Sequence, residues 1–105
     1  MLPSTLWLIC DKTFFKCKNL RKVTFGEESK LRTVGAFAFS RCVRLIDVVF
    51  PEGLERVGSS AFKESGLEKI TLPRTIKEVG RDVFSECSNL TIYIQDDCEV
   101  NLSDD

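Results

Sequence analysis

A block of about 23 residues recurs along this chain of 105 residues, and it constrains the fold more than any other feature. Solenoids and related repeat folds have periods of about 20 to 50 residues. Five columns keep the same phase, four of them apolar and one filled by small side chains. They are Leu20, Leu45, Leu67 and Leu90; Leu6, Leu31, Leu54 and Ile76; Ile9, Val34, Val57 and Val79; Phe14, Phe39, Phe62 and Phe84; and Cys17, Cys42, Ser65 and Cys87. The repeat predicts a stack of coils, each packed against the next.

The first half of a coil predicts a strand. In the segment from Leu45 to Phe50, positions one, four and six are apolar. We expect these side chains to point inward and the others to face outward, as alternation on a pleated strand requires. Pro51 then ends the strand, because proline has no N–H to donate to a sheet.

The second half of the same coil predicts a corner and an outer turn. Leu54 and Val57 turn inward, and Gly58 follows them. Glycine at this place permits either a positive φ or the close approach of another backbone. Ala61 and Phe62 predict a short helical or 3-10 turn on the outer side, with the phenyl ring inserted into the core.

These elements predict an α/β solenoid of about four coils that forms one domain. A chain of 105 residues with 43% hydrophobic content can supply one packed interior. We expect the solenoid to span residues 1–94 and an acidic C-terminal tail to span 95–105. Within the solenoid we expect a partial first coil at 6–19, coils at 20–44, 45–66 and 67–89, and a terminal strand at 90–94.

The last strand fits the repeat only after one residue is deleted from it. With the deletion, Leu90, Ile92 and Ile94 all face inward and Tyr93 lies on the outer face. The alternative buries Gln95, and an unpaired buried amide costs roughly 1 to 3 kcal/mol. We therefore prefer the deletion.

The start of the stack has one candidate cover, the segment 1–7. A solenoid must shield the apolar faces of its terminal coils, so we interpret Trp7 as a core or cap residue rather than a binding aromatic. The alternative is that the chain is cut from a longer array. In either case uncovered solenoid ends would allow a homodimer, because unpaired strand edges accept another chain.

The five cysteines are interpreted chiefly as small buried side chains. Cys17, Cys42 and Cys87 share a column in which the third coil has Ser65, so the column selects small residues. A reduced ladder is the preferred reading. A Cys17–Cys42 disulfide is the alternative, because stacked coils lie only about 4.8 Å apart.

Composition excludes several classes of function. The 15 basic and 16 acidic residues nearly cancel, so we expect no global field that attracts nucleic acid. The longest apolar run, from Leu6 to Cys10, is five residues and too short to insert into a membrane. The chain has no histidine, no C-x-x-C pair and no calcium-loop spacing. We therefore expect no enzyme activity, no catalytic residues, no cofactor and no metal.

The outward side chains of the predicted sheet form the candidate protein-binding surface. Alternating charges on neighbouring strands favour a self-satisfied charge ladder. Ile46, Val49 and Tyr93 are interpreted either as a binding patch or as a product of β propensity or of coverage by the tail. A face of four strands covers only about 300 Å², against about 800 Å² for one side of a standard interface. The candidate residues are Arg21, Lys22, Ile46, Asp47, Val49, Glu68, Lys69, Thr71 and Tyr93.

The chain resembles the BspA-type leucine-rich repeats of bacterial and protozoan surface proteins over roughly residues 6–94. The clearest stretch runs from Leu67 to Leu90, where the apolar, Pro73, Gly80 and Cys87 positions match in order. The resemblance implies a right-handed solenoid with a parallel sheet on its concave side. It also implies adhesion to a protein ligand at the cell surface, a location that no signal or anchor in the sequence indicates independently.

The leading hypothesis is therefore a non-catalytic module that binds a protein partner through the concave sheet. A structural stretch of a longer repeat array is the second hypothesis. An intracellular scaffold is the third, favoured by thiols that need no oxidation.

Overall fold

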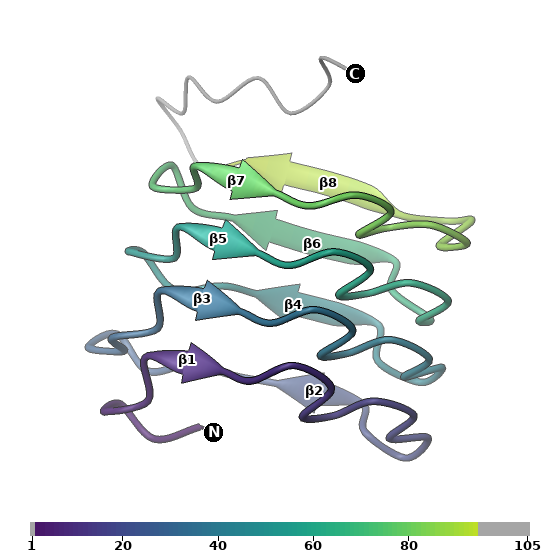
Figure 1. Cartoon of the computed structure of the whole chain (residues 1–105), viewed down its shortest axis with the longest axis horizontal. Coiled ribbons are helices and arrows are strands. Elements are labelled where there is room, and N and C mark those ends of the chain that lie inside the picture. Colours follow the sequence, from purple (N-terminus) through teal and green to yellow (C-terminus); the bar gives the residue numbers. More distant parts are fainter. Residues whose placement is uncertain (1, 95–105) are drawn as a thin grey trace.

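The computed structural model describes residues 2–94, which form eight short strands joined by turns. The strands make two parallel four-stranded sheets that face each other (Figure 1). One sheet contains β1 (Leu8–Ile9), β3 (Thr33–Val34), β5 (Arg56–Val57) and β7 (Glu78–Val79). The other contains β2 (Lys22–Val23), β4 (Asp47–Val49), β6 (Lys69–Leu72) and β8 (Thr91–Ile94).

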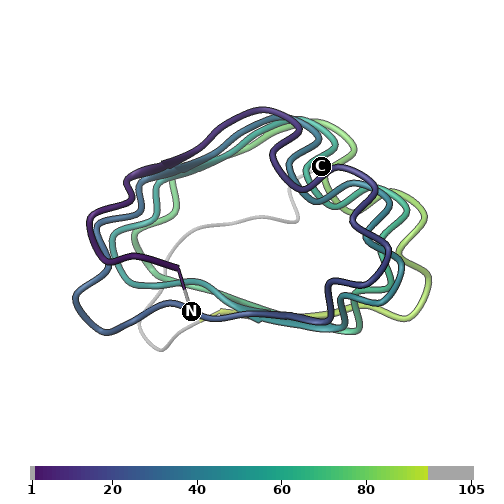
Figure 2. The same ribbon diagram turned by 90° about the horizontal axis from the view of Figure 1, so that it is seen from below.

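The chain climbs as a right-handed coil. In Figure 1 the nearer strands run left to right and the more distant strands run right to left as the chain rises from its N-terminus. Figure 2, viewed along the stack, shows successive coils superposed with the outer turns gathered on one side. The expectation of a parallel-sheet solenoid of about four coils is confirmed.

The sequence predicts the sheet β2-β4-β6-β8 but does not predict the second sheet. Its strands are only two residues long, so they show no apolar alternation that could reveal them. They form because the corner residues of adjacent coils pair their backbones: the Gly58 N–H donates to the Val34 carbonyl at 2.7 Å. Each coil therefore carries a strand on two of its sides.

The expected helical or 3-10 turn on the outer side is wrong, since residues 2–94 contain no helix. Alternate N–H groups of the outer turn donate to the next coil, as from Phe39 to the Ala61 carbonyl at 2.7 Å and from Arg41 to the Lys63 carbonyl at 2.9 Å. A helix directs its N–H groups along its own chain, whereas this turn needs left-handed residues to direct them along the stack. The left-handed residues occupy two repeat columns: Lys12, Phe37, Ser60 and Asp82, and Lys16, Arg41, Glu64 and Glu86.

A column of stacked phenyl rings forms the centre of the core. Phe39 lies between Phe14 and Phe62, with ring centroids 5.1 Å from each, and Phe84 follows at 6.1 Å from Phe62. Phe50 reaches Phe62 from the strand side at 5.9 Å. The rings of Phe39, Phe50 and Phe62 are fully buried, so the sequence column corresponds to a physical stack through the solenoid.

The glycine column exists because backbones approach closely at the corner. A Cβ atom on Gly58 would lie 2.6 Å from the Ala36 nitrogen, and one on Gly80 would lie 2.6 Å from the Ser59 nitrogen. Neither glycine has a left-handed φ. Of the two explanations offered for Gly58, the close approach of another backbone is therefore confirmed and a positive φ is wrong.

The last described strand confirms the expected deletion but not the expected burial. The β6–β8 register pairs Ile70 with Ile92 and Thr71 with Tyr93, so Tyr93 faces outward as predicted. Ile92 and Ile94 nevertheless stay exposed, because β8 is the edge of the described sheet. The predicted acidic tail, with Gln95 and Cys98, lies outside the described residues.

At the other end of the stack, the role expected of Trp7 is wrong, because its side chain is 61% exposed. Leu2 does contribute to the cover, since it bridges to Phe25 in parallel and its N–H donates to the Thr24 carbonyl at 3.1 Å. Leu2 and Leu6 pack against the core. Leu2 and Leu6, rather than the Trp7 indole, therefore shield the start of the solenoid.

We expect Phe62→Ala to destabilise the fold more than Phe84→Ala. Phe62 is fully buried between neighbouring rings, so its truncation should cost about 3 to 5 kcal/mol. Phe84 is half-buried at the end of the ring column, and its truncation should cost less than about 2 kcal/mol. Urea unfolding followed by circular dichroism measures both. Equal losses would contradict the stacked-column account.

Candidate protein-binding face

The sheet β2-β4-β6-β8 brings the predicted surface residues together on its outer side. The register pairs Lys22 with Asp47 and Asp47 with Lys69, in the order that the sequence indicated. On the same face Val49 pairs with Thr71, and Thr71 pairs with Tyr93. All nine candidate side chains are exposed except Thr71, which is half-buried.

The alternating charges on these neighbouring strands do not form ion pairs with one another. Within residues 2–94, Asp47 forms no ion pair with either Lys22 or Lys69. The Lys69 ammonium instead lies 5.9 Å from the centre of the Tyr93 ring. Among the described residues, the charged side chains of this face therefore have no ion-pair partner.

An apolar row runs along one coil, from the turn at Val43 to Val49 in β4. Val43, Ile46 and Val49 recur every third residue of one coil, and Tyr93 stands two strands beyond Val49. Their exposed fractions are 56, 46, 54 and 48% respectively. Sequence reasoning missed Val43, although a branched apolar residue where the preceding coil has Lys18 is the signal that could have identified it.

One end of the apolar row lies in a basic hollow of about 340 Å³. We define the basic hollow by its lining residues, which come from the outer turns of the first three coils: Lys16, Lys18, Arg41, Val43 and Glu64. Arg41 Nε donates to Glu64 Oε1 at 2.9 Å, and this guanidinium lowers the pKa of the Glu64 carboxyl. The hollow was not predicted, because the near-zero net charge of the chain conceals a local excess of cations.

The signal that sequence reasoning overlooked is the run of cations in the first coil. Residues 12–22 contain five basic side chains and no acidic one. Charge asymmetry within a chain is a signal of interaction in its own right, and a total charge near zero hides it. These cations are Lys12, Lys16, Lys18, Arg21 and Lys22.

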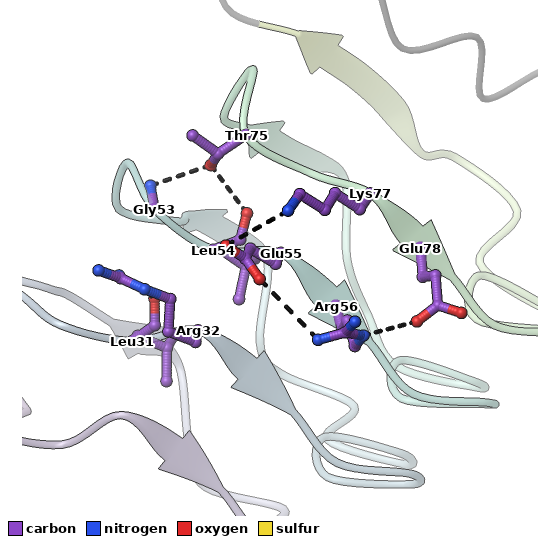
Figure 3. A network of polar contacts seen from close by, with 9 residues as sticks. All are labelled: Leu31, Arg32, Gly53, Leu54, Glu55, Arg56, Thr75, Lys77 and Glu78. Atoms are coloured by element: carbon purple, nitrogen blue, oxygen red, sulfur yellow. Dashed lines mark hydrogen bonds and ion pairs between the residues drawn. The ribbon is translucent and has the colours of Figure 1, made fainter.

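A larger hollow of about 620 Å³ lies over the other sheet, and its charges pair with one another. Figure 3 shows Arg56 between two carboxylates, with Nε 2.7 Å from Glu78 and a second nitrogen 3.9 Å from Glu55. Lys77 approaches Glu55 at 3.8 Å. Since these groups neutralise each other across coils, this hollow has less charge to offer a ligand than the basic hollow.

Thr75 stabilises the corner beside that network through two hydrogen bonds. The Thr75 hydroxyl donates to the Leu54 carbonyl at 2.8 Å and accepts the Gly53 N–H at 2.9 Å (Figure 3). Gly53 has a φ of 102° and lies against the Arg32 guanidinium, so this position suits only glycine. These contacts fix adjacent coils in register rather than form a binding site.

The cysteine column is a ladder of free thiols, as preferred over the Cys17–Cys42 disulfide. The Cys42 thiol donates to the Phe14 carbonyl at 3.0 Å, and the Cys87 thiol donates to the Phe62 carbonyl at 3.1 Å. Burial raises the pKa of Cys42 to about 11. Each of these two thiols therefore serves as a hydrogen-bond donor to the preceding coil.

No group of three or more histidine, cysteine, aspartate or glutamate side chains in residues 2–94 is arranged to hold a metal ion. In the same residues no helix has the length and apolar character needed to cross a membrane.

The family model for the BspA type leucine rich repeat region, in 6 copies, matches residues 1–101. No curated protein matches the chain. Among solved structures, a leucine-rich repeat protein from Bacteroides ovatus is similar, with a TM-score of 0.75 and 26% identity over 81% of this chain and 22% of that protein.

Two further solved structures share the fold. The pneumococcal vaccine antigen PcpA has a TM-score of 0.66 and 25% identity, over 92% of this chain and 30% of the antigen. A leucine-rich repeat protein from T. pallidum has a TM-score of 0.58 and 24% identity, over 87% of this chain and 56% of that protein. The chain thus spans between about a fifth and just over half of the length of these relatives.

We expect the stability of the fold to decrease between about pH 9 and pH 11 through Cys42. Its folded-state pKa is raised, so the unfolded chain loses this proton first. The stabilisation is complete below about pH 9 and is lost as the pH rises toward 11. Urea unfolding across this range should show a weaker alkaline decrease for Cys42→Ala than for the unsubstituted protein.

Cys10 provides the control for that experiment, because its thiol is exposed. Cys10→Ala should leave the alkaline decrease unchanged. In the folded protein at pH 8, Ellman's reagent should modify Cys10 much faster than Cys42. An alkaline profile that Cys42→Ala does not alter would contradict the assigned role of the buried thiol.

Proposed function

Because the chain belongs to the BspA-type leucine-rich repeat family, we propose that it is a non-catalytic module that binds a protein partner. The binding surface is the outer face of β2-β4-β6-β8, with the predicted residues Arg21, Lys22, Ile46, Asp47, Val49, Glu68, Lys69, Thr71 and Tyr93, to which Val43 is added.

The observation that carries the proposal is the exposed apolar row Val43, Ile46 and Val49 together with Tyr93. Contiguous apolar side chains rimmed by charged ones are typical of protein interaction sites. Tyrosine is enriched at interfaces because it combines a large apolar ring with a polar tip. The parallel sheet holds Val49 and Tyr93, in β4 and β8, at fixed spacings, so little of their backbone freedom is lost on binding.

The magnitude of the interaction follows from the size of the face. An outer face of about 300 Å² is well under half of the surface that each partner contributes to a standard interface. We therefore expect one copy to bind weakly through the sheet alone. Contacts on the flanks of the coils, or several linked modules acting together, would supply the remaining affinity.

A role as one stretch of a longer array is the second candidate. It is favoured by the small share, 22 to 56%, that the chain covers of the similar solved proteins. Adhesion at a cell surface is a finer proposal, supported by the family and by similarity to a pneumococcal vaccine antigen. The free thiols favour an intracellular scaffold as the alternative.

We expect Val49→Arg and Tyr93→Ala each to weaken partner binding, because both side chains are apolar and exposed on the outer face of the sheet. Peptides selected from a display library on the unsubstituted protein provide the probes. Their affinities should fall by about thirtyfold or more for a central anchor. Binding measured by biolayer interferometry on folded variants gives the comparison.

The matched control is Thr33→Arg, which adds the same arginine to the outer face of β3 in the other sheet. This variant should bind the selected peptides with unchanged affinity. If both face variants also retain full affinity, the sheet is not the binding surface and the proposal fails.

A further inference from the structure

We propose that the basic hollow is the docking site for an acidic polypeptide segment of the partner that carries an aliphatic side chain among its carboxylates. This inference rests on the proposed protein-binding function and names the class of partner. The carboxylates would pair with Lys16, Lys18 and Arg41, and the aliphatic side chain would pack on Val43.

The repeat sets the geometry of the hollow. Lys16 and Arg41 occupy equivalent positions in successive coils, as do Lys18 and Val43, since both pairs are separated by 25 residues. Adjacent parallel strands lie about 4.8 Å apart, so the coil spacing places cations of neighbouring outer turns in one small region. Their alignment follows from backbone hydrogen bonds, including that of the Lys16 N–H to the Ser40 carbonyl at 2.9 Å.

The cations of the hollow are poorly compensated by the chain itself. Arg41 pairs with Glu64, but within residues 2–94 neither Lys16 nor Lys18 forms an ion pair. The Lys16 ammonium lies 5.3 Å from the centre of the Phe15 ring, and the Lys12 ammonium lies 5.9 Å from the same ring. The two lysines of the hollow therefore lack a carboxylate partner among the described residues, and an anionic segment would supply one.

The lining distinguishes a polypeptide from a nucleic acid. Val43 contributes an aliphatic surface that is 56% exposed, which suits an aliphatic side chain. None of the side chains that line the hollow is aromatic, whereas single-stranded nucleic acids bind with bases stacked on aromatic rings. Glu64, which also lines the hollow, would repel a continuous line of phosphates, while separate carboxylates can be spaced to avoid it.

The hollow also joins the proposed binding face. Val43 is both a lining residue and the first member of the apolar row, which continues through Ile46, directly before β4, to Val49 within β4. A segment that places its carboxylates in the hollow can therefore extend along the row. The two surfaces together provide contacts on the flank that the sheet alone lacks.

The test measures the binding of a fluorescein-labelled decapeptide of glutamates with one central leucine to the full chain, by fluorescence anisotropy. We expect saturable binding that weakens as the salt concentration rises, because surface charge interactions are screened. The double variant K16E/K18E should lower the affinity by about tenfold or more. K16Q/K18Q tests the same site with smaller electrostatic disturbance, and circular dichroism checks that each variant is folded.

The matched control is K30E/K77E, which changes the net charge equally at two exposed lysines outside the hollow. It should retain at least half of the affinity. Replacing the central leucine of the peptide with glutamate, or introducing V43S, should each weaken binding several-fold. A decapeptide of lysines should not bind.

Several results would overturn the proposal: no binding of the glutamate peptide at millimolar concentration, equal losses in K16E/K18E and K30E/K77E, or tighter binding of oligothymidine or heparin than of the peptide. The proposed function is judged separately, through the library-selected peptides. If those peptides lose affinity with Val49→Arg while the glutamate peptide keeps its affinity in K16E/K18E, the sheet face stands and the hollow fails. Loss of the glutamate peptide with K16E/K18E alone supports the hollow and leaves the sheet to its own test.

Discussion

Backbone hydrogen bonding between adjacent coils is the constraint on which the rest of this structure depends. Each coil pairs with the next through two sheets and through the outer turn, as in the Gly58 to Val34 and Phe39 to Ala61 bonds. Parallel pairing on every side places each residue above its equivalent, so its environment repeats as well. Phenyl rings consequently stack on phenyl rings at 5.1 Å, and glycine recurs where a Cβ would meet a neighbouring backbone. The sequence therefore repeats because the environment of each position repeats from coil to coil.

The inward half of the fold could be predicted because burial leaves an unambiguous mark on residue type. The deletion before Ile92 followed from the cost of burying an amide, and the β6–β8 register confirmed it. The outer turn could not be predicted in the same way. Its left-handed residues include Lys16, Arg41 and Glu64, which have no intrinsic preference for positive φ. Backbone hydrogen bonds to the neighbouring coil impose that conformation, so the residue types do not reveal it.

The candidate site was predicted only in part for a related reason. Side chains on the outer face of the sheet alternate with buried ones, and that alternation located Val49 and Tyr93 correctly on the outside. The basic hollow combines outer-turn residues of three coils, so it becomes visible only when columns are compared rather than coils. The column Lys16, Arg41, Glu64 and Glu86 changes from basic to acidic along the stack. Basic and acidic residues cancel in the total charge of the chain, so a net charge of -1 does not reveal the local excess of cations.

The separation of inward and outward columns also explains how such a module can acquire specificity. Substitutions at Phe62 or Val48 affect every coil that packs on them, whereas Val43 and Lys18 project away from the core. Outer columns can therefore differ from coil to coil at little cost in stability, and the departures from the repeat are the positions where recognition can arise. A four-stranded face is too small to hold a partner tightly. Under the proposed function a partner would extend around a corner of the coil, since the apolar row ends at Val43, where cations of the outer turns line the basic hollow.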